Sequence, residues 1–166
     1  MKQFPDIDPL TIKQDPNLVA SLADDRKPNK TWYFLIIDDY MLIANATYFT
    51  DKLTKESEWL HYQIEFPKQG LLWYLDTIRN KFFKTEAEGG LPKGEIGASE
   101  VINGEELAIV RAMNADGNRG GGYTFVTVDR KDGLPKSYTF TDALLFEHGL
   151  MDLLDDIATK IKTGVL

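Results

Sequence analysis

The chain has 166 residues, of which 43% are hydrophobic and 27% charged, the composition of one ordinary globular domain. Its 19 Lys and Arg and 26 Asp and Glu give a net charge of −7, with no basic lobe. This balance weakens the case for a duplex-DNA binder, whose sequence-independent affinity comes from cations that neutralise phosphates. The absence of cysteine excludes disulfides, thiolate metal sites and cysteine nucleophiles.

The N-terminal stretch MKQFPDIDPL contains prolines and aspartates where a secretory signal needs an apolar core. No later stretch approaches the ~18 apolar residues of a membrane span. We therefore expect a cytoplasmic protein that does not contact a membrane. Residues 1–30 hold four of the seven prolines and a short helical possibility at residues 17–25, which predicts an N-terminal arm packed on the domain.

Three strands are expected next. Residues 31–38 and 40–49 are aromatic and β-branched and flank a turn at Asp38-Asp39, which predicts a hairpin. Residues 58–66 alternate with a period of two, which predicts one dry face and one wet face. The dry face would carry Leu60, Tyr62, Ile64 and Phe66, and the wet face Trp59, His61, Gln63 and Glu65.

A helix is predicted to begin at Pro67, because proline is favoured in a first helical turn, and to run to residue 83. Its apolar positions recur at spacings of four, three and four, which form one stripe of an amphipathic helix: Leu71, Leu75, Ile78 and Phe82.

Strand composition returns after a glycine-rich connection. We expect strands at residues 95–102, 105–113, 123–130 and 136–141, with turns at Asn103-Gly104, residues 116–122 and residues 131–133. A long final helix, capped by Thr141 or Asp142, is predicted to run to about residue 162.

The two predicted helices align with each other. Residues 70–82 match residues 149–161 without a gap, with six identities that include a glycine and an aspartate. The predicted fold class is therefore α+β, with an antiparallel sheet-then-helix unit repeated twice after the N-terminal arm. The pseudo-repeats would be residues 31–84 and 94–164, within a single domain of residues 31–166.

Residues 64–82, IEFPKQGLLWYLDTIRNKF, resemble the strand-to-helix junction of PUR-domain proteins. The matching positions are Ile64, Pro67, Gln69, Gly70, Leu71 and Asp76. PUR domains are built from repeats of a four-stranded antiparallel sheet and one helix, and the Whirly proteins have a similar arrangement. Both groups bind single-stranded nucleic acid on sheet surfaces, so the resemblance implies that fold and that activity.

The chain departs from the PUR pattern in two places. The predicted strands at residues 31–38 and 40–49 carry no Lys or Arg, whereas PUR strands do. The second half has Thr141-Asp142-Ala143 where the family junction would place its Pro-x-Gln-Gly run.

An exposed tryptophan on a sheet can stack a nucleic-acid base. We therefore predict a binding surface that combines aromatic and basic side chains, namely Trp59, His61, Arg111, Arg119, Arg130 and Lys131. Three alternatives stay open. The assignment of the two faces of residues 58–66 is inverted, or the N-terminal arm or a partner subunit covers the face with Trp59 and His61. In the third, the cations are dispersed as solubilising charge and do not converge.

No catalytic signature is present. The chain has two histidines and four scattered serines, without a Gly-x-Ser-x-Gly or His-Glu-x-x-His motif. We predict no catalytic residue, no metal ligand and no cofactor, and keep a carboxylate-dyad hydrolase as a minor alternative. The glycine-rich run at residues 117–122 is interpreted as a flexible hairpin tip or as a mobile clamp over a ligand.

The sequence thus predicts a non-enzymatic protein that binds single-stranded DNA or RNA. The alternative is an acidic protein-interaction or regulatory module of the same fold that does not bind nucleic acid, whose negative charge would steer a basic partner. A homodimer through the second predicted helix is compatible with both functions.

Overall fold

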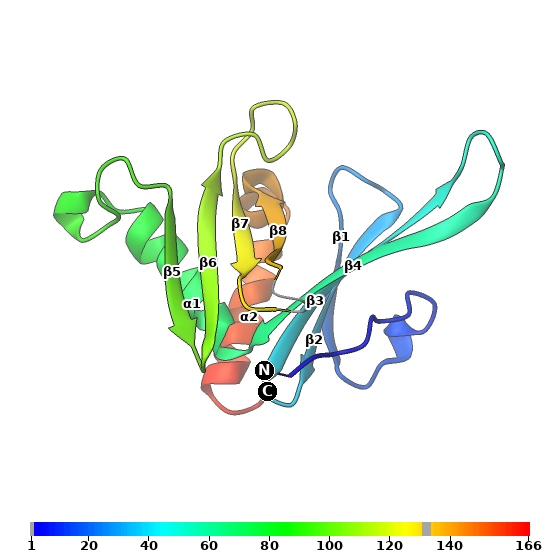
Figure 1. The fold of residues 1–166 in the computed structure, drawn as a ribbon, viewed down its shortest axis with the longest axis horizontal. Helices are drawn as coiled ribbons and strands as arrows, with labels where there is room; N and C mark the ends of the chain where they lie inside the picture. The colour runs from blue at the N-terminus through cyan, green and yellow to red at the C-terminus, as the bar shows by residue number, and fades with distance from the viewer. Residues whose placement is uncertain (1, 131–133) are drawn as a thin grey trace.

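The computed structural model describes residues 2–130 and 134–166, which form two four-stranded antiparallel sheets, each followed by a helix (Figure 1). Sheet one has its strands in chain order and leads directly into the first helix. Its elements are β1 (Leu18–Ala23), β2 (Lys30–Ile37), β3 (Tyr40–Thr50), β4 (Ser57–Pro67) and α1 (Gln69–Thr77), which a π-helical turn (Ile78–Phe82) continues.

Sheet two repeats this plan. It consists of β5 (Gly97–Ile102), β6 (Glu105–Ala112), β7 (Gly122–Thr127) and β8 (Lys136–Thr141), again in chain order, followed by a π-helical turn (Ala143–Glu147) and α2 (Leu150–Lys162). The predicted α+β fold with a repeated sheet-then-helix unit is confirmed. The Asn103-Gly104 turn also lies where expected, with both residues at positive φ.

The helical prediction for residues 17–25 is wrong. These residues contain β1, which pairs antiparallel with β2 and so becomes the outer strand of sheet one. Val19, Ala20 and Leu22 of this strand pack against the main core. Pairing with a neighbouring strand overrides the weak local preference of so short a segment.

The predicted final helix starts with the expected cap but is interrupted. The Leu144 backbone N–H donates to Thr141 Oγ1 at 3.1 Å, which is the hydrogen bond expected of a threonine that caps a helix. Gly149 then adopts a φ of 87°, a left-handed conformation that ends the π-helical turn and starts α2. The prediction missed this break because the apolar spacing continues across it.

The aligned helices use their shared leucines alike and their shared glycines differently. Leu71 and Leu150, at matching positions, are both completely buried. Gly70 is helical, and a Cβ there would lie 2.4 Å from Leu107 Cδ1, so glycine permits close packing of α1 on β6. Gly149 instead supplies the left-handed turn described above.

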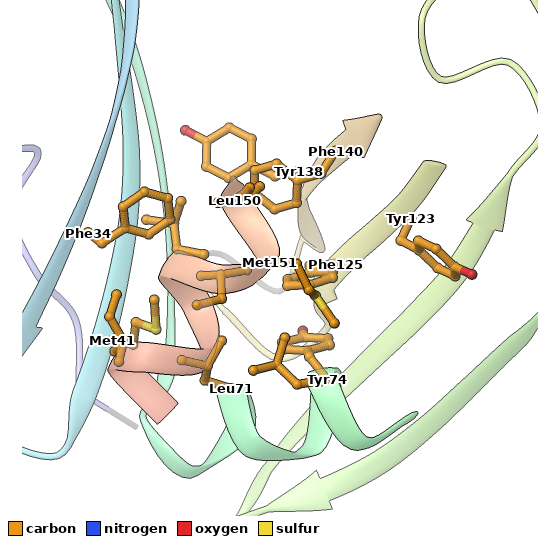
Figure 2. Packing of buried hydrophobic residues seen from close by; sticks show 14 of the residues in the cluster. Phe34, Met41, Leu71, Tyr74, Tyr123, Phe125, Tyr138, Phe140, Leu150 and Met151 are labelled. Carbon is orange, nitrogen blue, oxygen red and sulfur yellow. The ribbon is translucent and has the colours of Figure 1, made fainter. Parts of the chain in front are cut away.

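One core joins both sheets and both helices. Figure 2 shows Phe34 and Met41 of sheet one facing Leu150 of α2, with Phe125 of sheet two on the other side of the cluster. Tyr74 of α1 stacks on Phe125 with ring centroids 4.2 Å apart and 6° between the planes. Because the Tyr74 hydroxyl donates to the Val126 carbonyl at 2.7 Å, this buried ring leaves no polar atom without a partner.

The second face of sheet one lies under the N-terminal arm. Trp32 and Phe34 belong to the main core, whereas Tyr33 belongs to a smaller cluster on the opposite face, as the predicted alternation requires. Phe4 and Ile12 of the arm cover that second cluster. Sheet one is therefore buried on both faces along its inner half.

Candidate interaction surface

Arg130 was predicted as a surface cation, and the structure contradicts this. Its side chain is 1% exposed. One guanidinium nitrogen bonds both carboxylate oxygens of Glu105, at 2.9 and 3.0 Å, and the other reaches Glu65 Oε1 at 3.1 Å and the Lys2 carbonyl. A guanidinium held by two buried carboxylates is a structural group and is unable to reach a ligand in solvent.

Arg111 lies at the far end of β6 from Glu105, six residues or about 20 Å along the strand. Its guanidinium forms a bidentate pair with Asp142, both bonds being 2.6 Å, and lies over the Tyr123 ring at 4.6 Å. The hydrogen bonds that Arg111 donates to Asp142 raise the pKa of Arg111 above its usual value. The pair neutralises the charge that was predicted to contact phosphate.

Arg119 is exposed on the loop between β6 and β7. That loop is closed by its own hydrogen bonds: Asp116 Oδ1 accepts from the N–H groups of Asn118 and Gly120, at 2.7 and 2.8 Å. These bonds lower the pKa of Asp116. Lys131 lies outside the described residues, as does the predicted turn at residues 131–133.

The open face of sheet two lacks the expected binding groups. Alternation from the buried Ile109 directs the outward positions of its strands away from the core. In the described part of the chain these positions carry neither an aromatic nor a basic side chain; they include Ser99, Val101, Ala108, Val110, Thr124, Val126, Ser137 and Thr139. This face offers no base-stacking surface.

The predicted division of residues 58–66 into a dry and a wet face is only partly right. Both faces are exposed up to Tyr62 and both are buried from Gln63 onward. The arm accounts for the change on the predicted wet face, because Gln63 accepts from the Ile7 N–H at 3.2 Å and donates to the Pro5 carbonyl at 3.3 Å. Glu65, on the same face, is 2% exposed and pairs with Arg130.

The N-terminal arm covers this face of β4 only as far as His61, and the face beyond His61 is exposed to solvent. His61 Nε2 lies 3.9 Å from Asp6 Oδ2 of the arm. Trp59 is 38% exposed and Tyr48, its partner across the ladder, is 43% exposed. Their ring centroids are 5.2 Å apart, with 52° between the planes. We call Tyr48, Trp59 and His61 the hairpin aromatic face.

The hairpin aromatic face sits on the outer part of β3 and β4, which projects away from the rest of the molecule (Figure 1). Sequence reasoning found Trp59 and His61 but missed Tyr48. Tyr48 could have been found from the hairpin itself. A turn at residues 51–56 fixes the register of the two strands, and that register pairs Tyr48 with Trp59.

The opposite face of the projecting hairpin carries a second aromatic group. Leu60 is 56% and Tyr62 is 40% exposed, and Tyr62 meets Tyr138 of β8 edge-on with centroids 5.0 Å apart. Lys136 Nζ lies 5.9 Å from the centre of the Tyr62 ring. Two cations, Lys52 and Lys55, stand exposed in the connecting turn.

The three predicted cations that the structure describes therefore do not converge. Arg130 is buried between the sheets, Arg111 is paired at the other end of β6, and Arg119 lies on a separate loop. Trp59 and His61 share one face as predicted. Within the described ranges no three His, Asp or Glu side chains gather as a metal site, and no helix there is long and apolar enough to cross a membrane.

Comparisons with known proteins find no related family and one solved structure of low similarity. No protein-family model matches the chain, and no curated protein matches it significantly. A solved structure titled "Crystal structures of trypanosoma bruciei MRP1/MRP2" is similar over 94% of this chain and 92% of that chain, with a TM-score of 0.44 and 10% sequence identity.

Proposed function

We propose that this protein binds single-stranded DNA or RNA without catalysing a reaction, and that bases stack on the hairpin aromatic face. The observation that carries the proposal is the exposed pair formed by Tyr48 and Trp59, open to solvent beyond the point where the N-terminal arm ends. Base stacking on an exposed aromatic ring contributes about 1–3 kcal/mol per base and tolerates any base. The resemblance of residues 64–82 to the PUR-domain junction supports the same function.

The cations that accompany this face differ from those predicted from the sequence. Lys52 and Lys55, in the turn of the same hairpin, are exposed and close in the chain to the aromatic pair. Asp51, Glu56 and Glu58 share that part of the hairpin, so the electrostatic attraction for phosphate is weak. Stacking would thus contribute more of the affinity than charge does, which makes the affinity fall gently with salt.

Alanine variants test the proposal. Trp59→Ala and Tyr48→Ala should each weaken binding of a labelled single-stranded oligonucleotide by about 1–3 kcal/mol, or roughly 5- to 150-fold. Phe83→Ala is the matched control, because Phe83 is an exposed aromatic residue (57%) outside the hairpin. Unchanged affinity in a folded Trp59→Ala variant would remove this face from the binding site.

A second candidate is an acidic module that binds a basic protein. It is favoured by the net charge of −7 and by the pairing of Arg111 and Arg130 with carboxylates, which leaves neither cation free to repel a basic partner. The discriminating probe is a labelled Lys-rich peptide. Tight, salt-sensitive binding of that peptide, together with no binding of oligonucleotides, would favour this function.

A further inference from the structure

β4 is the outermost strand of sheet one, so one of its two edges has no strand beside it. It is 11 residues long and pairs with β3 along its whole length, without a break in register. An unpaired edge presents a row of N–H and C=O groups that can accept another strand.

The hydrogen bonds at the two ends of the ladder show which groups point outward. The Asp51 N–H donates to the Glu56 carbonyl at 2.8 Å, and the Lys68 N–H donates to the Asp39 carbonyl at 2.8 Å. Antiparallel pairs alternate between bonded and non-bonded, so even-numbered residues of β4 bond β3 and odd-numbered residues face outward. Pro67 is odd-numbered and has no N–H, which is how proline is tolerated at a strand edge.

Sheet two covers the inner half of this edge. Lys136 Nζ reaches the outward Gln63 carbonyl at 3.5 Å, and Arg130 bonds the Glu65 side chain beside it. The outer half is open: Ser57, Trp59 and His61 are all exposed. In the described part of the chain no backbone group outside β3 bonds these three residues.

We propose that this open edge pairs antiparallel with the same edge of a second copy of the chain, with the two-fold axis at Trp59. This register places Trp59 opposite Trp59 of the second copy and Ser57 opposite His61, so that every outward group of the three residues is hydrogen-bonded. Because the two-fold axis passes through Trp59, the outward groups of Ser57, Trp59 and His61 in one copy pair with the same three residues of the other copy. The pairing also covers part of the exposed Trp59 and Leu60 side chains.

The same register makes Glu58 a diagonal neighbour, not a direct partner, of Glu58 in the second copy, although each copy carries a net charge of −7. It sets Glu58 opposite Leu60 and Glu56 opposite Tyr62 of the second copy, so no carboxylate directly opposes another. Repulsion between the two acidic bodies is long-range and is reduced by salt. The dimer should therefore become tighter as salt is raised.

This inference does not depend on the proposed function. The pairing uses the backbone edge of β4, whereas base stacking would use the side chains on its faces. In the dimer the two hairpin aromatic faces become neighbours on one continuous sheet. The dimer also differs from one formed through α2, which uses no β4 backbone.

A matched pair of variants tests the inference by sedimentation velocity over a range of protein concentrations, without nucleic acid. His61→Pro removes one outward N–H and leaves the β3 ladder intact, whereas His61→Ala removes the side chain and keeps the N–H. We expect wild type and His61→Ala to dimerise, with His61→Pro weakening the dimer about tenfold or more. A monomer at every concentration, or a dimer that His61→Pro leaves unchanged, would overturn the inference.

Amide hydrogen exchange in the wild-type protein keeps the inference testable if His61→Pro fails to fold. The Trp59 and His61 amides should be protected at concentrations where the dimer forms and should exchange rapidly in dilute solution. Rapid exchange at both concentrations would contradict the pairing.

Discussion

Arg130 and Glu65 belong to opposite halves of the chain, and their side chains meet at 3.1 Å in the interior, 1% and 2% exposed. Glu105 of β6 completes the cluster, and its carboxylate also accepts from the Tyr40 hydroxyl. Arg130 further donates to the Lys2 carbonyl. One guanidinium therefore ties together sheet one, sheet two and the N-terminal arm.

Loss of that guanidinium should destabilise the whole fold. Arg130→Met would leave two buried carboxylates without their cation, and removing one partner from a buried ion pair costs about 3–5 kcal/mol. Urea denaturation measures the free energy of unfolding. Arg119→Met, at an exposed loop position, is the control and should change it by less than about 0.5 kcal/mol. An Arg130→Met protein within about 1 kcal/mol of wild type would contradict the role assigned to Arg130.

Asp24 makes the stability of the β1–β2 connection depend on pH. Desolvation raises the pKa of Asp24, but hydrogen bonds from the backbone of Arg26, the Trp32 indole and the backbone of Lys27 outweigh it, so the pKa lies below its usual value. A carboxyl whose pKa is lower in the folded state stabilises the fold above its unfolded pKa, and this contribution is lost as pH falls through the folded value.

The Trp32 indole proton reports on this transition, because Trp32 Nε1 donates to Asp24 Oδ2 at 3.1 Å. Its NMR signal should shift with a midpoint below the ordinary aspartate pKa of about 3.9. In Asp24→Asn the acid-dependent shift should disappear. A midpoint at or above the ordinary value would show that the hydrogen bonds do not outweigh burial.

Two glycines of the second half should respond differently to alanine. At Gly149 nothing lies within 4 Å of an added Cβ, so only the positive φ opposes Gly149→Ala, at about 1–2 kcal/mol. At Gly122 the added Cβ would lie 2.3 Å from the Phe140 carbonyl oxygen, across the β7–β8 ladder. Gly122→Ala should therefore cost more than Gly149→Ala in thermal or urea unfolding. The reverse order would contradict the packing of β7 on β8.

The pair formed by Arg111 and Asp142 should contribute to stability and little to nucleic-acid binding. Both side chains are partly exposed, so a double-mutant cycle with Arg111→Gln and Asp142→Asn should give a coupling of roughly 1 kcal/mol, at the upper end for pairs open to solvent. Oligonucleotide affinity of Arg111→Gln should stay within about twofold of wild type. A tenfold loss of affinity would return Arg111 to the binding surface.

The sequence predicted correctly those parts of the fold that depend on the spacing of apolar residues within a single strand or helix. The alternation of Trp32, Tyr33 and Phe34 and the apolar spacing that begins at Leu71 each report on the burial of one element, and the structure agrees with both. The strand β1 was missed because its identity depends on pairing with β2, which short local sequence does not encode.

The candidate site was predicted less well, for a physical reason. Arg130 and Arg111 looked like available cations, but their carboxylate partners, Glu65, Glu105 and Asp142, lie 25 to 65 residues away in the chain. Arg130 meets Glu65 because the two sheets pack on each other, whereas Arg111 meets Asp142 because the strands of sheet two pair with one another. Trp59 and His61 were easier, because a period of two fixes which residues share a face.

The most direct test of the account is the fluorescence anisotropy of labelled single-stranded DNA and RNA titrated with the protein across a salt series, with a duplex of the same sequence as control. The proposed function predicts binding of the single strands at low salt, weaker binding of the duplex and a gentle loss of affinity as salt rises. Absence of single-strand binding at low salt, where attraction to phosphate is greatest, would contradict it.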